Sequence, residues 1–194
     1  MKKIYTLVLF VITFFSGNAQ IVDIPDGNFK AKLLQASPEN AIAVNAEGQY
    51  IKIDINDDGE IQENEALSVF QLDVSFSDIQ NLVGIEAFLN LTGLKCEYNQ
   101  LTSLDVTQNV ALENIYCNSN QLTSLDVTQN VALGYINCSY NQLTSLNVTQ
   151  NVSLYLFECS NNQLISLDVS QNSALIFLKL KRNPNRSSSD KQEL

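Results

Sequence analysis

Oxygen-bearing side chains stand at alternate positions from residue 54 to residue 62, and another follows at residue 65. They are Asp54, Asn56, Asp58, Glu60, Gln62 and Glu65. Carboxylate and amide oxygens are the ligands that Ca²⁺ prefers, and Gly59 permits the sharp turn that gathers them around one ion. The spacing therefore predicts a calcium site. The alternative is a solvated Asp-Gly turn that leads into a helix.

This segment resembles the calcium loop of EF-hand and dockerin-type proteins, because residues 54–65 fit the pattern D-x-[DN]-x-[DN]-G-x5-E at every specified position. The resemblance implies side-chain coordination by Asp54, Asn56 and Asp58 and a bidentate carboxylate from Glu65. It also implies a backbone carbonyl ligand from Glu60 and a direct or water-mediated contact from Gln62. The chain has a single loop of this kind, so we expect a structural role for calcium rather than signalling.

The flanks of the loop predict a helical cap over residues 20–68. Asp26 is a suitable N-cap for a helix that runs to about Gln35, and a second helix is expected from about Gln62 into Val69. A solenoid end exposes an apolar face that needs a cover. We expect calcium to fix the angle between these helices so that they cover the first repeat.

A 21-residue unit begins at Leu91 and occurs four times almost unchanged, followed by a shortened copy that ends at Pro184. Its pattern is L-x-x-L-x-C-x-x-N-x-L-x-x-L-x-V-x-x-N. A divergent turn, residues 69–90, precedes the array and carries Ser77 where the other copies have asparagine. Its stretch Gly84 to Asn90 predicts a short helical turn. A fixed period of this length indicates a solenoid in which each coil packs on the next.

Each unit contains the alternation L-x-[apolar]-x-x-N twice, so we expect two short strands per coil on opposite sides. Coils stacked about 4.8 Å apart would place the apolar residues in buried columns. The asparagines would form two columns whose amides satisfy buried backbone groups. These are Asn99, Asn120, Asn141, Asn162 and Asn183, and Asn109, Asn130, Asn151 and Asn172.

Residues 69–183 resemble the leucine-rich repeats of secreted, internalin-like bacterial proteins. The resemblance implies an α/β solenoid: an arc of stacked parallel β-coils, mostly β, with a small helical N-terminal cap. It also implies that the L-x-C strands line the inner side that faces a partner. We place the repeat domain at residues 69–185 and a disordered polar tail at 186–194.

Cys96, Cys117, Cys138 and Cys159 occupy one repeat position. Side chains stacked nearly 5 Å apart exceed the usual disulfide Cβ spacing of about 3.5–4.5 Å, and a straight column cannot surround one zinc ion. We therefore expect buried free thiols that act as small apolar core residues.

Composition narrows the function. The net charge of −10 disfavours nucleic acid and anionic lipid, and the absence of histidine removes the usual general base. Lys2, Lys3, a short apolar run and small residues before Gln20 predict a signal peptide at residues 1–19 and therefore a secreted or bacterial cell-surface protein, with an uncleaved anchor as the alternative. We expect no membrane span and a monomer.

The copies differ mainly at the outward positions of the L-x-C half. Because aromatic residues are common anchors for proteins and sugars, these positions predict a partner-binding face. Its expected residues are Lys95, Tyr98, Tyr116, Tyr135, Asn137, Tyr140, Glu158, Phe177 and Lys179. Drift on a free surface would give the same variation. The Asp and Thr ladder of the other half could bind cations weakly or order water, but a solvated ladder is the simpler interpretation.

Three functions follow. The first is a binding module for a protein or glycan, with calcium in its cap. The second is a structural spacer or assembly subunit without a ligand of its own. An enzyme is disfavoured, because these residues supply no nucleophile paired with a base.

Overall fold

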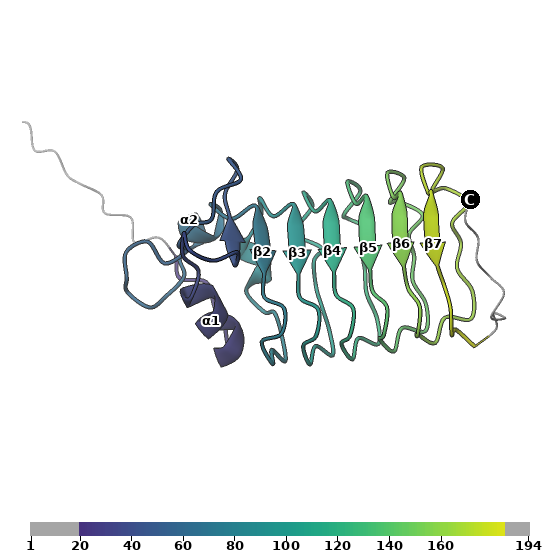
Figure 1. Ribbon diagram of the computed structural model, residues 1–194, viewed down its shortest axis with the longest axis horizontal. Coiled ribbons are helices and arrows are strands. Elements are labelled where there is room, and N and C mark those ends of the chain that lie inside the picture. Colours follow the sequence, from purple (N-terminus) through teal and green to yellow (C-terminus); the bar gives the residue numbers. More distant parts are fainter. Residues whose placement is uncertain (1–19, 185–194) are drawn as a thin grey trace, which may run out of the picture.

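A computed structural model describes residues 20–184 of the 194-residue chain. The chain forms an elongated stack of coils with a small cap at its N-terminal end (Figure 1). The proposed signal peptide and the predicted tail lie outside the described residues. Within residues 20–184 no helix is long and apolar enough to cross a membrane.

Each coil contributes one three-residue strand, β2 to β7, to a single sheet whose first strand, β1 (Ala43–Val44), comes from the cap. The parallel strands are β2 (Gln71–Asp73), β3 (Gly93–Lys95), β4 (Asn114–Tyr116), β5 (Tyr135–Asn137), β6 (Leu156–Glu158) and β7 (Phe177–Lys179). Equivalent residues pair from coil to coil, so that Leu94 lies beside Ile115 and Ile115 beside Ile136. The repeat period thus fixes the register, and Figure 1 shows the strands lined up on one side of the stack.

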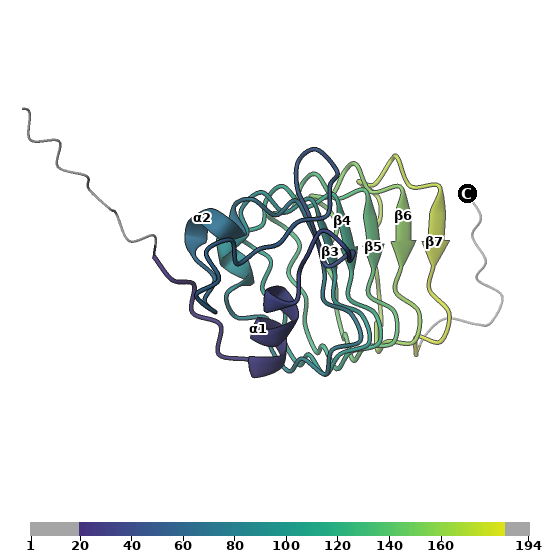
Figure 2. The ribbon, with the colours of Figure 1, turned by 60° about the vertical axis from the view of Figure 1, so that its left-hand side comes forward.

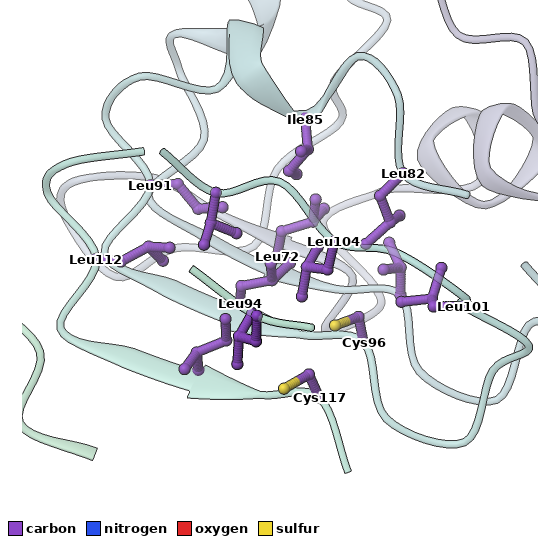
Figure 3. Close-up of a cluster of buried hydrophobic side chains, with 14 of the residues drawn as sticks. Leu72, Leu82, Ile85, Leu91, Leu94, Cys96, Leu101, Leu104, Leu112 and Cys117 are labelled. Carbon is purple, nitrogen blue, oxygen red and sulfur yellow. The ribbon is translucent and has the colours of Figure 1, made fainter. Parts of the chain in front are cut away.

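The apolar repeat positions fill the interior. In Figure 3, Leu72, Leu94, Cys96 and Cys117 point into one core from successive coils. The side chains of Leu94, Cys96 and Cys117 have no solvent exposure, and the four cysteines are buried and form no disulfide. Buried thiols without a disulfide were predicted from their register, and the structure confirms this.

The prediction of a second strand in each coil was wrong. On that side the structure has an isolated bridge between Asp105 and Asp126. The reason is local: the Asp126 carboxylate accepts hydrogen bonds from the backbone N–H and the hydroxyl of Thr128, at 2.9 and 2.7 Å. This side-chain turn competes with a continuous ladder and bends the chain.

The asparagine columns were predicted correctly, but the two columns differ. Asn120 donates to the carbonyls of Cys96 and Cys117 and accepts the N–H of Leu101 at 3.0 Å. Asn130 donates to two carbonyls, while its Oδ1 has no hydrogen-bond partner within residues 20–184. The first column therefore supports both neighbouring turns, and the second supports its turns only as a donor.

The cap combines two helices with a short strand. Helix α1 (Gly27–Leu34) has Asp26 as its N-cap, as predicted, and α2 (Glu63–Ala66) is shorter than expected. Strand β1 (Ala43–Val44) pairs antiparallel with β2 and covers the edge of the sheet. A 3₁₀ helix, η1 (Ile85–Ala87), forms the expected helical turn in the first coil. Figure 2 shows α1 and α2 together at one end of the stack.

Candidate functional site

The outward side chains of β2 to β7 form one surface, which we call the strand face. Because side chains alternate along a strand, the first and third residues of each strand point outward while the middle residue is buried. The face carries Gln71, Gly93, Asn114, Tyr135, Leu156 and Phe177 in one column. A second column consists of Asp73, Lys95, Tyr116, Asn137, Glu158 and Lys179.

Contacts between side chains run along the second column from strand to strand and pass through Tyr135 of the first column. The Lys95 ammonium lies 3.8 Å from the Asp73 carboxylate and 5.9 Å from the centre of the Tyr116 ring. The Tyr116 and Tyr135 rings are 4.7 Å apart and tilted by 49°. These contacts join four neighbouring strands, β2 to β5.

The row continues through the Tyr135 hydroxyl, which donates to Glu158 at 3.1 Å, and Glu158 also accepts from the Lys179 ammonium at 3.0 Å. Burial and the nearby Glu158 charge raise the pKa of Tyr135, so this hydroxyl stays a donor. We call the set Asp73, Lys95, Tyr116, Tyr135, Glu158 and Lys179 the contact row. Five of its members are residues predicted for partner binding, and Asp73 is an addition.

Asn137 and Phe177 lie on the same face but outside the contact row. The Asn137 side chain accepts the backbone N–H of Ser139 at 3.1 Å, which orders the end of its own strand. Phe177 occupies the last strand, in the column of Tyr135, and is about one-third exposed.

Tyr98 and Tyr140 occupy a different position, in the bend that follows each strand. Both have a positive φ, 53° and 57°, and both rings are more than half exposed. Tyr98 stacks on Phe76, with 4.5 Å between ring centres and 11° between planes. Phe76 was missed in the sequence because its coil diverges from the repeat pattern.

A hollow of about 220 Å³ lies at the cap end of the strand face. Its lining includes Val44 of β1, Gln71 and Asp73 of β2, Lys95 of β3 and Tyr116 of β4. Gly93 lies between Gln71 and Asn114, and the missing side chain opens the middle of the hollow. Every later coil has a larger residue at this position, which is a signal that the sequence did contain.

The predicted calcium residues lie together in one tight loop beside α2. Both oxygens of the buried Asp54 carboxylate accept backbone N–H groups, from Asp58 at 3.2 Å and Gly59 at 3.1 Å. The buried Glu65 carboxylate accepts the N–H groups of Ile55 and Gln62, at 2.8 and 3.0 Å. These bonds hold residues 54–65 in a closed turn in which Gly59 has a φ of 79°.

The amide side chains of this loop point their nitrogens at Asp58. Asn56 and Gln62 donate to its Oδ2 at 2.9 and 2.8 Å. The backbone N–H of Glu60, followed by the Gln62 and Asn56 amides, lowers the pKa of Asp58 despite some burial. In this conformation no group of three or more acidic, Cys or His residues within residues 20–184 is arranged to hold a metal ion.

The donor set of the loop still fits calcium chemically. It consists of three carboxylates and two amides, and a half-turn of each amide would present its oxygen in place of its nitrogen. Along the chain, β1 and an antiparallel bridge between Val44 and Tyr50 lie between α1 and the loop. An ion pair between Lys30 and Glu60, at 2.6 Å, links the loop to α1.

No protein-family profile and no curated protein matches the chain. Solved structures do match it. The functional domain of InlJ from Listeria monocytogenes, described as including a cysteine ladder, has 29% identity and a TM-score of 0.55, over 84% of this chain and 43% of that one. A leucine-rich repeat protein of Leptospira interrogans, LIC12759, has 26% identity and a TM-score of 0.59, over 63% and 34% of the two chains.

An internalin of Listeria monocytogenes, InlF, shares the fold with a TM-score of 0.64 at 19% identity, over 84% of this chain and 46% of that one. The chain spans less than half the length of each of these structures. Fold, period and cysteine column agree with the sequence analysis. The chain is an internalin-like leucine-rich repeat solenoid.

Proposed function

We propose that the chain is a secreted or cell-surface module that binds a macromolecular ligand, most directly a protein, through its strand face. The contact row is the observation that carries this proposal. It places two tyrosines and four charged groups in fixed positions across the outward side of β2 to β7.

A pre-ordered surface binds more tightly because fewer side chains lose freedom on binding. Tyr116 and Tyr135 are each held by a neighbour on both sides, so they have already lost that freedom in the unbound protein. Tyrosine is also among the residues that dominate binding energy at protein interfaces. The Gly93 hollow beside them offers a recess for a ligand side chain or a single sugar ring.

The test is capture of partners from extracellular or host-surface extracts by the chain without residues 1–19. We expect the double variant Y116A/Y135A to lose its partner while keeping its fold. T123A/T144A is the matched control, because it removes two exposed side chains from the other half of the same two coils. A second variant, G93N, fills the hollow with the residue that the next coil carries at this position. Glycan arrays run in parallel separate a sugar ligand from a protein ligand.

A spacer without a ligand is the second candidate, and the pairing of charges favours it. Lys95 is paired with Asp73, and Lys179 with Glu158, so the face has few free charges to offer a partner. If the chain is a spacer, either wild type captures no partner, or wild type and Y116A/Y135A capture the same proteins equally well. Either result would overturn the binding proposal.

We further propose a structural calcium ion in the loop at residues 54–65. The all-oxygen donor set and the turn at Gly59 support it, and the loop is joined to the rest of the cap at several points. The backbone of Val22 donates to Ile61, Glu63 donates to Gln20, and Lys30 pairs with Glu60. An ion that stiffens the loop would therefore stiffen the N-terminal segment and α1.

A further inference from the structure

Exposed and half-buried side chains with one shared backbone conformation form a column along the bends that follow the strands. We call it the bend column, and its members have φ between 51° and 60°: Phe76, Tyr98, Ser119, Tyr140, Asn161 and Arg182. Residues with the same φ at the same place in each coil project their side chains in similar directions. The side chains of the column are therefore aligned, one per coil, along the axis of the solenoid.

Phe76 and Tyr98 show how rings pack in this column. Their centres are 4.5 Å apart and their planes differ by 11°, so the rings lie face to face along the axis. The ring spacing is close to the distance of about 4.8 Å between neighbouring strands. One aromatic ring per coil therefore stacks without adjustment of the backbone.

Ser119 interrupts this stack. It lies between Tyr98 and Tyr140, two residues that are 52% and 57% exposed. The two tyrosines are two coil spacings apart, which corresponds to about 9–10 Å along the axis. A flat ring at the level of Ser119 would lie about 4.5–5 Å from each tyrosine, within the range of aromatic stacking.

We propose that an aromatic side chain of a partner protein inserts over Ser119 and stacks between Tyr98 and Tyr140. This inference rests on the proposed binding function and names the group that the bend column recognises. The column already stacks two protein rings at the required spacing, and a ligand ring extends that stack by one coil.

The polar groups nearby favour a flat ring over a sugar. The backbone N–H groups of Tyr98, Ser119 and Tyr140 all donate to carbonyls of the next coil, at 3.1, 2.9 and 2.8 Å. They are therefore not free to bind the hydroxyls of a sugar. The faces of the two tyrosines are left as the main binding surfaces, and they suit an apolar or weakly polar ring.

The key variant is S119Y, which places the protein's own ring in the position. Tyr98 and Tyr140 adopt the same φ within a few degrees, so the backbone at Ser119 accepts tyrosine. S119N is the matched control, because Asn161 occupies the equivalent position one coil beyond Tyr140. Circular dichroism and thermal melting establish that both variants are folded.

The probe is N-acetyl-tryptophanamide, titrated into the chain without residues 1–19 while the tyrosine ring signals are followed by NMR. We expect saturable shifts of the Tyr98 and Tyr140 signals in wild type and S119N. In S119Y the affinity should fall about tenfold or more, because both ring contacts are blocked. Unmoved signals in wild type, or equal binding by S119Y, would overturn the inference.

Two further arms separate the alternatives. In the first arm, methyl β-glucopyranoside is titrated in the same way. If the sugar shifts the signals of both tyrosines and N-acetyl-tryptophanamide does not, the site binds a sugar and this inference is overturned. A protein partner that S119Y captures as well as wild type, but that Y116A/Y135A loses, would overturn the bend-column site and leave the strand-face proposal standing. If wild type binds the indole probe and Y116A/Y135A still captures every partner, the strand-face proposal alone is contradicted.

Discussion

Asp26 accepts the backbone N–H of Gln80 at 2.8 Å, across 54 positions of the chain. The same carboxylate oxygen accepts the N–H of Asn81, while its other oxygen accepts those of Asn28 and Phe29 at the start of α1. One side chain therefore caps the N-terminus of α1 and fastens the helix to the first coil. This arrangement explains how a small cap is held on the open end of a solenoid.

Replacing Asp26 by alanine should destabilise the protein by about 2–4 kcal/mol, since an N-cap contributes about 1 kcal/mol and hydrogen bonds to a charged group about 1.5–3 kcal/mol. Urea unfolding at pH 7 measures the loss. D23N is the control, because Asp23 is a nearby exposed acid. An effect of D26A no larger than that of D23N would contradict the role of Asp26.

The same carboxylate should make stability depend on pH. Burial raises the pKa of Asp26, but the N–H groups of Phe29, Gln80, Asn81 and Asn28 together outweigh burial and leave its pKa below the ordinary value. A lowered pKa contributes stability that is complete above the ordinary value near 4 and is lost as the pH falls through the folded value. The stability gap between wild type and D26N should therefore be constant from pH 7 to about 5 and narrow below about pH 4. A gap that widens on acidification would contradict this assignment.

Gly84 marks a second contact between the N-terminal segment and the first coil. Its φ is 103°, and an added Cβ would lie 2.7 Å from Cγ1 of Ile24 and 2.9 Å from the carbonyl oxygen of Asp23. Gly48 also has a positive φ, 78°, but open space around it. We expect G84A to cost about 1–3 kcal/mol more than G48A, because it adds a clash to the same backbone strain. Equal melting temperatures of the two variants would show that residues 22–24 do not pack tightly there.

The repeat made the solenoid predictable from the sequence. The cap and the contact row depend on contacts between residues that are far apart in the sequence. Identical coils fix their own register, so the columns of leucine, cysteine and asparagine could be written from the sequence. Strand β1 has two residues, too few for a periodic signal, and the second role of Asp26 requires knowing where Gln80 lies. The contact between Tyr116 and Tyr135 is diagonal and follows only from the geometry of neighbouring strands.

The two asparagine columns should respond differently to alanine. Asn120 uses both ends of its amide, whereas the Oδ1 of Asn130 has no hydrogen-bond partner in the described part of the chain. N120A strands a buried N–H in addition to buried carbonyls, and N130A strands carbonyls only. We therefore expect N120A to be less stable than N130A by about 1–3 kcal/mol in urea unfolding. The opposite order would contradict the hydrogen-bond pattern.

The cysteine thiols should be inert in the folded protein. Burial raises the pKa of Cys117 to about 12, and it also raises those of Cys96 and Cys138. Because the thiolate is the reactive form, Ellman's reagent at pH 8 should modify none of the four until denaturant is added. Rapid modification of the native chain would show that the column is open to solvent.

Calcium should raise the melting temperature through the loop at residues 54–65. At a calcium concentration of about 100 times Kd the stabilisation is about 2.7 kcal/mol, or about 5–10 °C for a chain of this size. E65Q should abolish the difference between calcium and EDTA, whereas E63Q, an exposed acid in the same helix, should keep it. The readout is this difference and not the melting temperature itself, because Glu65 also accepts the N–H groups of Ile55 and Gln62 and its loss destabilises the chain without any ion. Identical melting of wild type in calcium and EDTA would contradict the site, and a difference that persists in E65Q would place the ion elsewhere.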